Sequence, residues 1–404
     1  MKVLFVTLLD FENINEHSLY TDLLRTLVEN GHELTVISPI EKRSNRPASV
    51  KEYPLCKIIK PVIGNIQKTN YFEKMTSLFR LNRIVVQALT KDADNVEYDL
   101  ILYSTPPITI AGLIKSIRKK CSAATTVLML KDIWPQEMVD LAIIKKNGIL
   151  ESYFRKQEKD LYSLSDWIGC TSQANVDYLL SHNDYLNSEK VILIHNSVDP
   201  IPLSADQRAR QHIREKYHLP SDVRVFFYGG NLGKAQGIDY LLGCLQYVLN
   251  RKECFFVICG NGTEYYKLER FFEEQRPDNM LLLPYMSKSD YNDLLDVADV
   301  AMVFLNSSFT VPNDPSRYYT YLEHAKPIFA CTDKATNIGN EISQEKLGWW
   351  CESEDVNDFA QIVETILQTN KEELVTMGLR ARAVLEREYM VIDDYYRIIK
   401  CVER

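Results

Sequence analysis

The chain has 404 residues, of which 46% are hydrophobic and 25% are charged, and its net charge is −8. This length exceeds what one hydrophobic core normally supports, so we expect two domains, and the ordinary composition excludes a largely disordered chain. The acidic balance and the lack of a recognised module argue against a nucleic-acid partner. The nine cysteines form no C-x-x-C pair, which indicates reduced thiols in the cytoplasm and argues against a zinc site or a disulfide framework.

The chain opens with apolar runs separated by a helical stretch. Residues 2–9 predict a buried strand, because Asp10 and Glu12 interrupt the run long before a signal peptide or a membrane span would be complete. A helix follows over 19–31, with Ser18 as its cap, and then a strand over 32–38. Further continuous apolar runs predict a parallel sheet that helices cover on both faces: 99–104, 125–130, 166–172 and 190–196.

A basic region lies between the early strands. Residues 41–91 carry 11 basic and 3 acidic side chains, which favours an acidic partner such as phospholipid headgroups or a polyphosphate. Within this region, residues 66–90 have helical periodicity, with aromatic side chains beside lysines and arginines. Such a helix can lie at a membrane interface, or it can be an ordinary domain helix with a solvated basic face. The pattern leaves both readings open, and any membrane association would be peripheral.

Polar groups follow the strands of this first half. Lys131 and Asp132 come directly after the strand at 125–130, so we expect them at the carboxyl edge of the sheet. Asp132 can orient a sugar hydroxyl there, or it can simply cap the next helix. His17 and His195 also follow strands and can face the same edge.

A second series of strands follows the polar, proline-containing linker at 199–206. The predicted strands are residues 223–230, 253–260, 279–285, 299–305, 326–332 and 347–352. We therefore expect an N-terminal domain over 1–200 and a C-terminal domain over 201–385. The last helix, about 386–404, is expected to cross back onto the first domain. Ligands of such sheets bind at the carboxyl ends of the strands, in a cleft between the two halves.

Three loops of the second half have features of an anion site. Glycine-containing turns at 229–237 and 260–264 allow close approach of a phosphate, and Lys234 adds a positive charge, although glycines at strand ends often only make turns. A helix is predicted to begin at Pro315, with Asn313 or Asp314 as its cap, so its free N–H groups can bind a diphosphate. The alternative is a well-capped surface helix with no ligand.

Five sequence strings in this order resemble retaining nucleotide-sugar glycosyltransferases of family 4, particularly the bacterial enzymes that build O-antigen, capsule or exopolysaccharide. The strings are KDIWPQE, VILIHNSVD, GGNLGKAQGIDYLL, GNGTE and PSRYYTYLEHAKPIFA. The resemblance covers nearly the whole chain. It implies an α/β fold with two facing Rossmann-like, doubly wound parallel-sheet domains, the GT-B architecture.

The resemblance also implies a set of site residues. The expected catalytic group is Lys234, Arg317, Asp132 and His17. The expected donor-binding group is Gly230, Asn231, Gly260, Asn261, Glu264, Pro315, Ser316, Tyr318, Thr320 and Glu323. The donor phosphate is thought to help take the acceptor proton in this family, so no dedicated base is required.

The chain departs from the family pattern at several of these positions. Thr320 stands where the family has the glutamate that holds the donor ribose, and Pro312 stands at the position of the pair's first glutamate. Glu323, one helical turn beyond Thr320, is a candidate replacement. Asn231 and Gln236 occupy positions where an arginine and a lysine are common.

The resulting expectation is a metal-independent, retaining sugar transferase without a cofactor. It would use a nucleotide-sugar donor, with UDP favoured over GDP, and a lipid-diphosphate-linked or oligosaccharide acceptor. We expect it in the cytoplasm, peripheral on the cytoplasmic face of the inner membrane against anionic lipid. Two alternatives remain: a sugar-nucleotide epimerase of the same architecture, and a non-catalytic binding or scaffold protein, which the missing glutamates favour.

Overall fold

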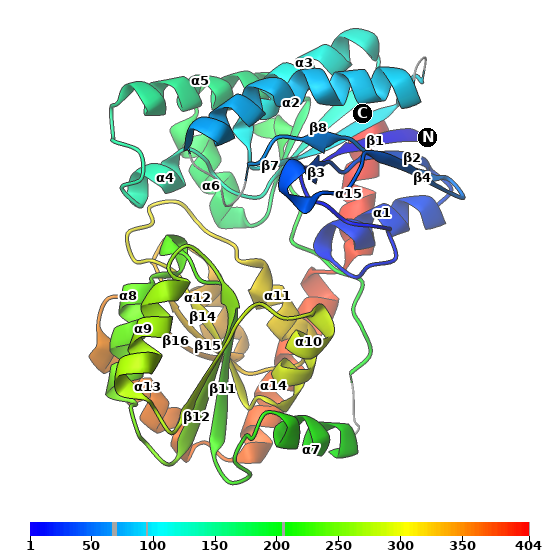
Figure 1. Cartoon of the computed structure of the whole chain (residues 1–404). Helices are drawn as coiled ribbons and strands as arrows, with labels where there is room; N and C mark the ends of the chain where they lie inside the picture. The colour runs from blue at the N-terminus through cyan, green and yellow to red at the C-terminus, as the bar shows by residue number, and fades with distance from the viewer. Residues whose placement is uncertain (67–70, 94–95, 204–206, 404) are drawn as a thin grey trace. The chain divides into compact units, whose positions relative to one another are not determined.

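The computed structural model describes residues 1–66, 71–93, 96–203 and 207–403 (Figure 1). The chain divides into two compact units: unit 1 is Met1–Asp199 with Met390–Arg404, and unit 2 is Pro200–Tyr389. Each unit contains a mainly parallel sheet with helices on both faces, so the predicted α/β class is confirmed. All nine cysteines are buried and have free thiols.

Unit 1 is built on an eight-stranded sheet in the order β10-β9-β8-β7-β1-β2-β5-β4, in which only β4 runs antiparallel to its neighbour. The strands are β1 (Lys2–Val6), β2 (Glu33–Ile37), β4 (Ser49–Tyr53), β5 (Cys56–Lys60), β7 (Leu100–Thr105), β8 (Thr125–Leu130), β9 (Trp167–Cys170) and β10 (Val191–Leu193). Two short strands, β3 (Ile40–Glu41) and β6 (Val62–Ile63), pair separately. The strands between 40 and 63 were not predicted.

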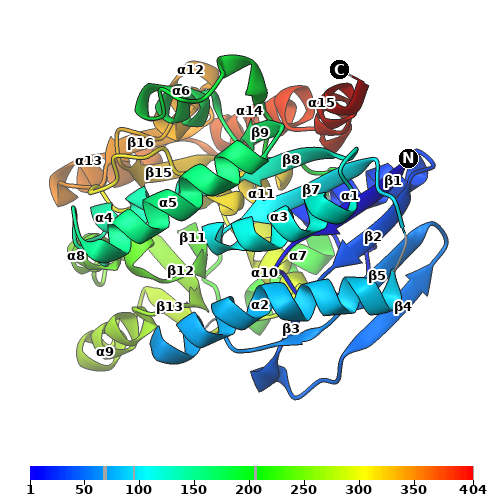
Figure 2. The same ribbon diagram turned by 90° about the horizontal axis from the view of Figure 1, so that it is seen from above.

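Helices cover both faces of this sheet. In the view from above, α2, α3 and α5 lie side by side across one face (Figure 2). On the other face α1 packs against α15, and both contribute to the hydrophobic core. The Ser18 side chain caps α1 as predicted, because it accepts from the backbone N–H of Thr21. The helices are α1 (Leu19–Glu29), α2 (Tyr71–Asp92), α3 (Ala111–Lys120), α4 (Gln136–Asp140), α5 (Ile149–Leu164), α6 (Gln173–His182) and α15 (Val391–Glu403).

The helix of the basic region is α2, which begins later than the predicted residue 66. Leu81 and Val85 are buried, and α2 packs against α3, β5 and β6, so this half of α2 is an ordinary domain helix. The aromatic and basic groups proposed for membrane contact include Lys68 and the side chains of Tyr71, Phe72, Lys74, Met75 and Phe79, which lie outside the described part of the chain. No helix in the described ranges is long and apolar enough to cross a membrane.

Unit 2 is built on a six-stranded sheet in the order β13-β12-β11-β14-β15-β16, in which every pair is parallel. The strands are β11 (Arg224–Asn231), β12 (Cys254–Asn261), β13 (Met280–Leu283), β14 (Val300–Phe304), β15 (Ile328–Thr332) and β16 (Gly348–Glu352). Because the strands are parallel, their carboxyl ends share one edge of the sheet, the edge that binds ligands in folds of this kind.

Helices α8, α9 and α13 cover one face of the unit 2 sheet, while α10, α11 and α14 lie on the other (Figure 1). The core between the sheet and the first group contains many aromatic side chains, including Phe226 and Phe256, whose rings stack with centroids 4.6 Å apart. The helices are α7 (Gln207–Lys216), α8 (Ile238–Tyr247), α9 (Tyr265–Gln275), α10 (Lys288–Val297), α11 (Ser316–Glu323), α12 (Ile338–Glu345), α13 (Val356–Gln368) and α14 (Lys371–Glu388).

Candidate active site

A cavity of about 210 Å³ lies at the carboxyl edge of the unit 2 sheet, beside the first turn of α8. Its lining includes Lys234 after β11, Glu264 after β12, Asn306 after β14 and Ser353 after β16. Groups from distant parts of the sequence meet here because parallel strands end at one edge. Lys234 and Glu264 were predicted from sequence. Asn306 and Ser353 were missed, and the only signal for them was their position just after apolar runs.

The turn after β11 is held by amide groups. Asn231 Nδ2 donates to Gln236 Oε1 at 2.9 Å, and the same oxygen accepts from the Gly233 N–H at 3.2 Å. The side chains that replace the family's arginine and lysine therefore bind each other. Asn306 stabilises the same turn, because its Nδ2 donates to the Lys234 carbonyl at 3.1 Å. The Lys234 side chain is exposed and supplies a positive charge at the mouth of the cavity.

The glycines of the two turns serve mainly to pack the turns together. Gly260 has a φ of +146°, and a Cβ added to it would lie 1.8 Å from the carbonyl oxygen of Gly230. A Cβ on Gly262 would lie 2.2 Å from the carbonyl oxygen of Leu232. Only glycine fits where two backbone segments approach each other this closely. We predicted that Gly260 admits a phosphate, and the structure instead gives it a backbone neighbour.

Arg317 projects from α11 to the end of β11. Its Nη2 donates to the Asn231 carbonyl at 3.3 Å, and its guanidinium carbon lies 4.8 Å from the centroid of the Tyr228 ring. Nη1 is buried and has no hydrogen-bond partner among the described residues. A Cβ on Gly230 would meet this guanidinium at 3.3 Å. The structure thus brings Arg317, Gly230 and Asn231 together, and one nitrogen of the guanidinium has no hydrogen-bond partner among the described residues.

The start of α11 differs from the prediction. The helix begins at Ser316, with Pro315 in the cap position and no side-chain cap. Asn313 and Asp314 do not fill that role, since the Asp314 carboxylate accepts a hydrogen bond from the Tyr319 hydroxyl at 2.6 Å. The first N–H groups of α11 are therefore not covered by a capping side chain, and the positive end of the helix dipole lies beside Ser316.

Tyr318 does not belong to the donor-binding face of α11. It is buried, with 1% of its surface exposed, and its hydroxyl donates to Glu341 at 2.6 Å. Tyr389 donates to the same carboxylate at 2.7 Å. Burial raises the pKa of Glu341, and these hydrogen bonds offset only part of that rise. Tyr318 therefore anchors the buried side of α11 to Glu341. Our prediction that it contacts the donor is wrong.

Glu323 also has a different role from the one expected. Its Oε1 accepts from the Ile201 N–H at 3.0 Å, and 3% of the residue is exposed. Arg382 donates to the carbonyls of both Ile201 and Glu323 at 2.8 Å. Glu323 thus fixes the start of unit 2 and does not replace the missing ribose ligand. Thr320 is half-buried on α11 and remains the candidate at that position.

The remaining predicted residues of unit 2 connect the two turns. The Asn261 carbonyl accepts from the Leu232 N–H at 2.8 Å, and the Glu264 N–H donates to the Leu232 carbonyl at 3.0 Å. The Glu264 carboxylate accepts from Lys267 at 3.1 Å. Asn261 therefore acts through its backbone in positioning the turn after β11, whereas Glu264 also lines the cavity.

The carboxyl edge of unit 1 has its basic groups bound to the protein itself. Lys131 Nζ donates to Asn196 Oδ1 at 2.9 Å and to the His195 carbonyl at 3.2 Å. The His195 ring nitrogen Nδ1 lies 2.8 Å from the Thr171 carbonyl oxygen. These bonds join the loops after β8, β9 and β10, so Lys131 and His195 organise this edge.

Asp132 lies beside a second carboxyl group, Glu137, which the sequence reading missed. Burial and the negative charge of Asp132 raise the pKa of Glu137 well above its ordinary value. Glu137 Oε1 is buried and has no hydrogen-bond partner in the described part of the chain. The signal available in the sequence was an acid five residues after Asp132 in the same loop. The pair thus places a carboxyl with a raised pKa beside Asp132 at this edge of the sheet.

His17 is tied to the start of α1. Its Nδ1 lies 2.8 Å from Asp22 Oδ2, and the Asp22 side chain is fully buried. Burial alone would raise the pKa of Asp22, but hydrogen bonds from His17 and the Asp199 backbone outweigh it and lower the pKa. An imidazole oriented by a buried carboxylate can exchange a proton, so His17 stays a predicted acid or base.

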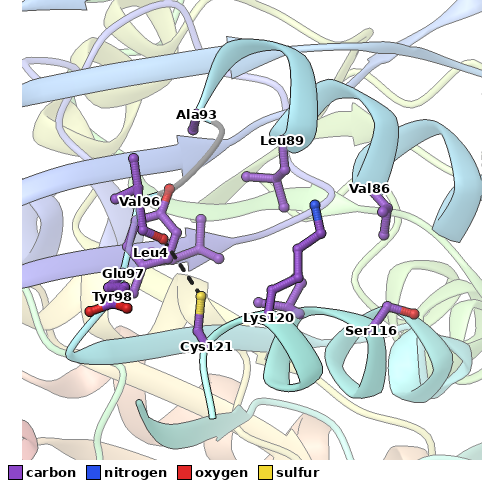
Figure 3. Close-up of a pocket in the computed structure, with 11 residues that line it drawn as sticks. Leu4, Val86, Leu89, Ala93, Val96, Glu97, Tyr98, Ser116, Lys120 and Cys121 are labelled. Atoms are coloured by element: carbon purple, nitrogen blue, oxygen red, sulfur yellow. Dashed lines mark hydrogen bonds between the residues drawn. The ribbon is translucent and has the colours of Figure 1, made fainter. Parts of the chain in front are cut away.

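Unit 1 has another cavity, of about 370 Å³, between α2, α3 and the amino end of the sheet (Figure 3). Lys120 lines it and donates to Thr90 Oγ1 at 2.7 Å, and the Cys121 sulfur lies 3.7 Å from the Val96 carbonyl oxygen. No predicted site residue lines this cavity. It lies at the opposite end of the strands from Asp132.

Two family profiles match most of the chain between them. The family described as Glycosyltransferase Family 4 matches residues 18–201, and the family described as Glycosyl transferases group 1 matches residues 209–384. A relative named Probable glycosyltransferase WbjE, from Pseudomonas aeruginosa, is 25% identical over 309 residues, which are 75% of this chain and 74% of that protein.

Solved structures share the fold over almost the full length. Anabaena Alr3699/HepE in complex with UDP-glucose has a TM-score of 0.69 and 14% identity, covering 100% of this chain and 99% of that chain. WaaG, a glycosyltransferase involved in lipopolysaccharide biosynthesis, has a TM-score of 0.65 and 13% identity, covering 99% and 98%. The fold is therefore GT-B. The two profiles, which together span most of the chain, show that it belongs to the family 4 glycosyltransferases.

Proposed function

We propose that the protein transfers a sugar, with retention of anomeric configuration and without a metal ion, from a UDP-sugar to a glycan acceptor in bacterial surface polysaccharide synthesis. The acceptor is a lipid-diphosphate-linked glycan at the cytoplasmic face of the inner membrane. UDP is favoured over GDP because Alr3699/HepE is similar in fold and binds UDP and UDP-glucose. The basic region at 41–91 would attract the anionic headgroups.

One observation carries this proposal: the buried, unpartnered Nη1 of Arg317 at the carboxyl end of β11. Negative charge grows on a leaving diphosphate in the transition state, so a fixed cation there stabilises that state more than the ground state. Lys234 adds a second charge, and the uncapped start of α11 adds backbone N–H groups. A donor phosphate oxygen takes the acceptor proton, so no protein base is needed.

Unit 1 would hold the acceptor. The Asp132 carboxylate can accept a hydrogen bond from a sugar hydroxyl, and a protonated Glu137 can donate one. Lys131, His195 and Asn196 keep the loop of Asp132 in place through the hydrogen bonds described above. This division assigns anion binding to unit 2 and hydroxyl recognition to unit 1.

A donor screen tests the proposal directly. A panel of UDP-sugars and GDP-sugars is offered with a lipid-diphosphate glycan, and transfer is followed by mass spectrometry, with the anomeric configuration read by proton NMR. We expect transfer from one UDP-sugar, retention of configuration and undiminished activity after EDTA treatment. Arg317→Gln should abolish most of this transfer.

Other outcomes would replace the proposal. Conversion of a donor without any acceptor would identify an epimerase. A chain that binds neither UDP nor GDP in calorimetry would be a non-catalytic scaffold. Inversion of configuration or loss of activity with EDTA would remove the corresponding part of the mechanism.

A further inference from the structure

A second cavity in unit 2 lies at the amino edge of the sheet, opposite the edge that carries Lys234 and Arg317. Its volume is about 410 Å³, which is within the range of small-molecule sites. The lining comes from α7, from the residues before β14 and β15, from the start of β11 and from α14. None of the groups assigned to the donor or the acceptor lines this cavity.

Cationic side chains dominate the lining. Five are present: Arg210, Arg214, Arg224, Lys326 and Lys371. The only carboxylates in the lining are Asp296 and Asp299. So many like charges around one cavity repel one another unless an anion lies between them.

Neither carboxylate is available to balance these charges fully. Asp299 Oδ2 accepts from the Val225 N–H at 2.8 Å, and Asp296 Oδ1 lies 2.7 Å from His324 Nδ1. Arg214 is directed at backbone carbonyls, those of Val297 at 3.3 Å and Pro220 at 2.7 Å. The side chains that line the cavity therefore carry a net positive charge.

Two buried nitrogen atoms in this lining have no partner among the described residues. One is His324 Nε2, on a side chain of which only 4% is exposed. The other is Arg224 Nε, although Nη2 of the same guanidinium donates to the Thr369 carbonyl at 2.6 Å. Buried polar atoms normally have partners, so these two indicate a missing ligand.

The pKa of Lys326 also reflects the excess of positive charge in this lining. It is 6% exposed, and its Nζ donates to the carbonyls of Asp296 and Ala298 at 2.6 and 3.0 Å. Burial and the charge of Arg210 lower the pKa of Lys326 to about 7, and Asp296 and Asp299 offset only part of this fall. An anion in the cavity would favour the charged ammonium.

We propose that this cavity binds a phosphate group, either as free phosphate or as a small organic monophosphate, at a site separate from the donor site. Arg224 Nε donates to its oxygens, and Arg210 and Lys371 supply charge at the mouth. Aliphatic side chains of α14, including Leu374 and Val375, contact the carbon skeleton of an organic ligand. The lining contains no phenylalanine, tyrosine or tryptophan ring to stack on a nucleotide base.

Calorimetry of the full-length chain with inorganic phosphate, and separately with glycerol 3-phosphate, tests the site. Arg210→Gln and Lys371→Gln change exposed or half-buried cations, and each should weaken binding about tenfold. The matched control is Arg270→Gln, an exposed cation on α9 of the same unit. Lys234→Gln separates this cavity from the donor site and should leave this binding event unchanged. Tighter binding of glycerol 3-phosphate than of phosphate would identify an organic monophosphate, and equal binding would identify free phosphate.

A second readout does not depend on substitution. The imidazole ¹⁵N resonances of His324 should shift on addition of phosphate to the wild-type chain, because this ring lines the cavity that the anion enters. The proposal is overturned if no phosphate binds at millimolar concentration, if Lys234→Gln weakens the binding as much as Arg210→Gln does, or if the His324 resonances do not move.

Discussion

The carboxyl edges of the two sheets are built alike from strand, loop and helix, but they use their charged groups in opposite ways. At unit 2 the Arg317 guanidinium keeps an unpartnered N–H, and the Lys234 side chain is exposed. At unit 1, Lys131 is bound to the carbonyl of His195 and to Asn196, and Oε1 of Glu137 is a buried oxygen without a hydrogen-bond partner among the described residues. The first edge suits an anion and the second suits hydroxyl groups.

The largest effect should come from removing the unit 2 cation. Arg317→Gln should lower kcat/KM for sugar transfer by roughly 10²–10³, because the side chain acts on charge that develops in the transition state. Steady-state kinetics with the donor identified in the screen measures this change. Arg270→Gln, an exposed arginine on α9, serves as the control and should leave kcat/KM unaltered. A loss of less than about threefold in Arg317→Gln would show that unit 2 is not specialised for the diphosphate.

Replacing one glycine in each unit by alanine tests whether the turns of unit 2 depend on close backbone packing. Gly260→Ala should destabilise the chain by about 3 kcal/mol, because the new Cβ would meet the Gly230 carbonyl. Gly31→Ala in unit 1 should cost only about 1 kcal/mol, since its φ of +79° is strained for alanine but nothing lies within 4 Å. Thermal unfolding compares them, and equal losses would contradict the packing of the turns.

Lys234 should have a smaller effect than Arg317. Lys234→Gln should lower kcat/KM about tenfold, because an exposed ammonium is solvated and screened by salt. The difference between wild type and variant should shrink as salt is added. Lys252→Gln, which changes an exposed lysine before β12 at the opposite edge of the sheet, is the matched control. Equal sensitivity of both variants to salt would remove Lys234 from the donor site.

The smallest effect concerns the acid pair of unit 1. Between the ordinary Glu pKa of 4.5 and the raised pKa of Glu137 in the folded chain, the folded chain keeps this proton while the unfolded chain loses it. The folded state then binds more protons, so this group makes the free energy of unfolding fall as pH rises. Glu137→Gln should remove this part of the fall, and denaturation between about pH 5 and pH 8 measures it. Asp160→Asn, an exposed acid on α5, should leave the pH dependence as in wild type.

The strands of both sheets were predictable because buried parallel strands are continuous apolar runs. The hairpin of β4 and β5 was missed because β4, with the sequence SVKEY, lies at the sheet edge and is mostly exposed, so its residues carry no such run. Its lysines were instead counted as part of a basic region. Edge strands of this kind are decided by the neighbour that they pair with, and sequence pattern alone does not identify that neighbour.

The candidate site was predictable where topology alone decides position. Lys234 and Arg317 were placed at one edge because both lie near carboxyl ends of parallel strands or at a helix start. The predicted cap of α11 was wrong because Asp314 accepts a hydrogen bond from Tyr319 instead. The predicted role of Tyr318 was wrong because its hydroxyl donates to Glu341, 23 residues away. Glu137 was missed because the raised pKa of its carboxyl results mainly from burial, which the sequence pattern does not show. Competition between local and distant hydrogen-bond partners is settled only by the tertiary structure.

The stacking of Arg317 on Tyr228 has a thermodynamic consequence. A free arginine or lysine side chain carries about 2 kcal/mol of rotamer entropy. Arg317 gives up much of its rotamer freedom when the chain folds, because Tyr228 and the Asn231 carbonyl already fix the guanidinium plane. Lys234, in contrast, keeps its freedom until a ligand arrives. The arginine therefore sets the orientation of the bound phosphate, while the lysine contributes attraction from whichever direction the anion approaches.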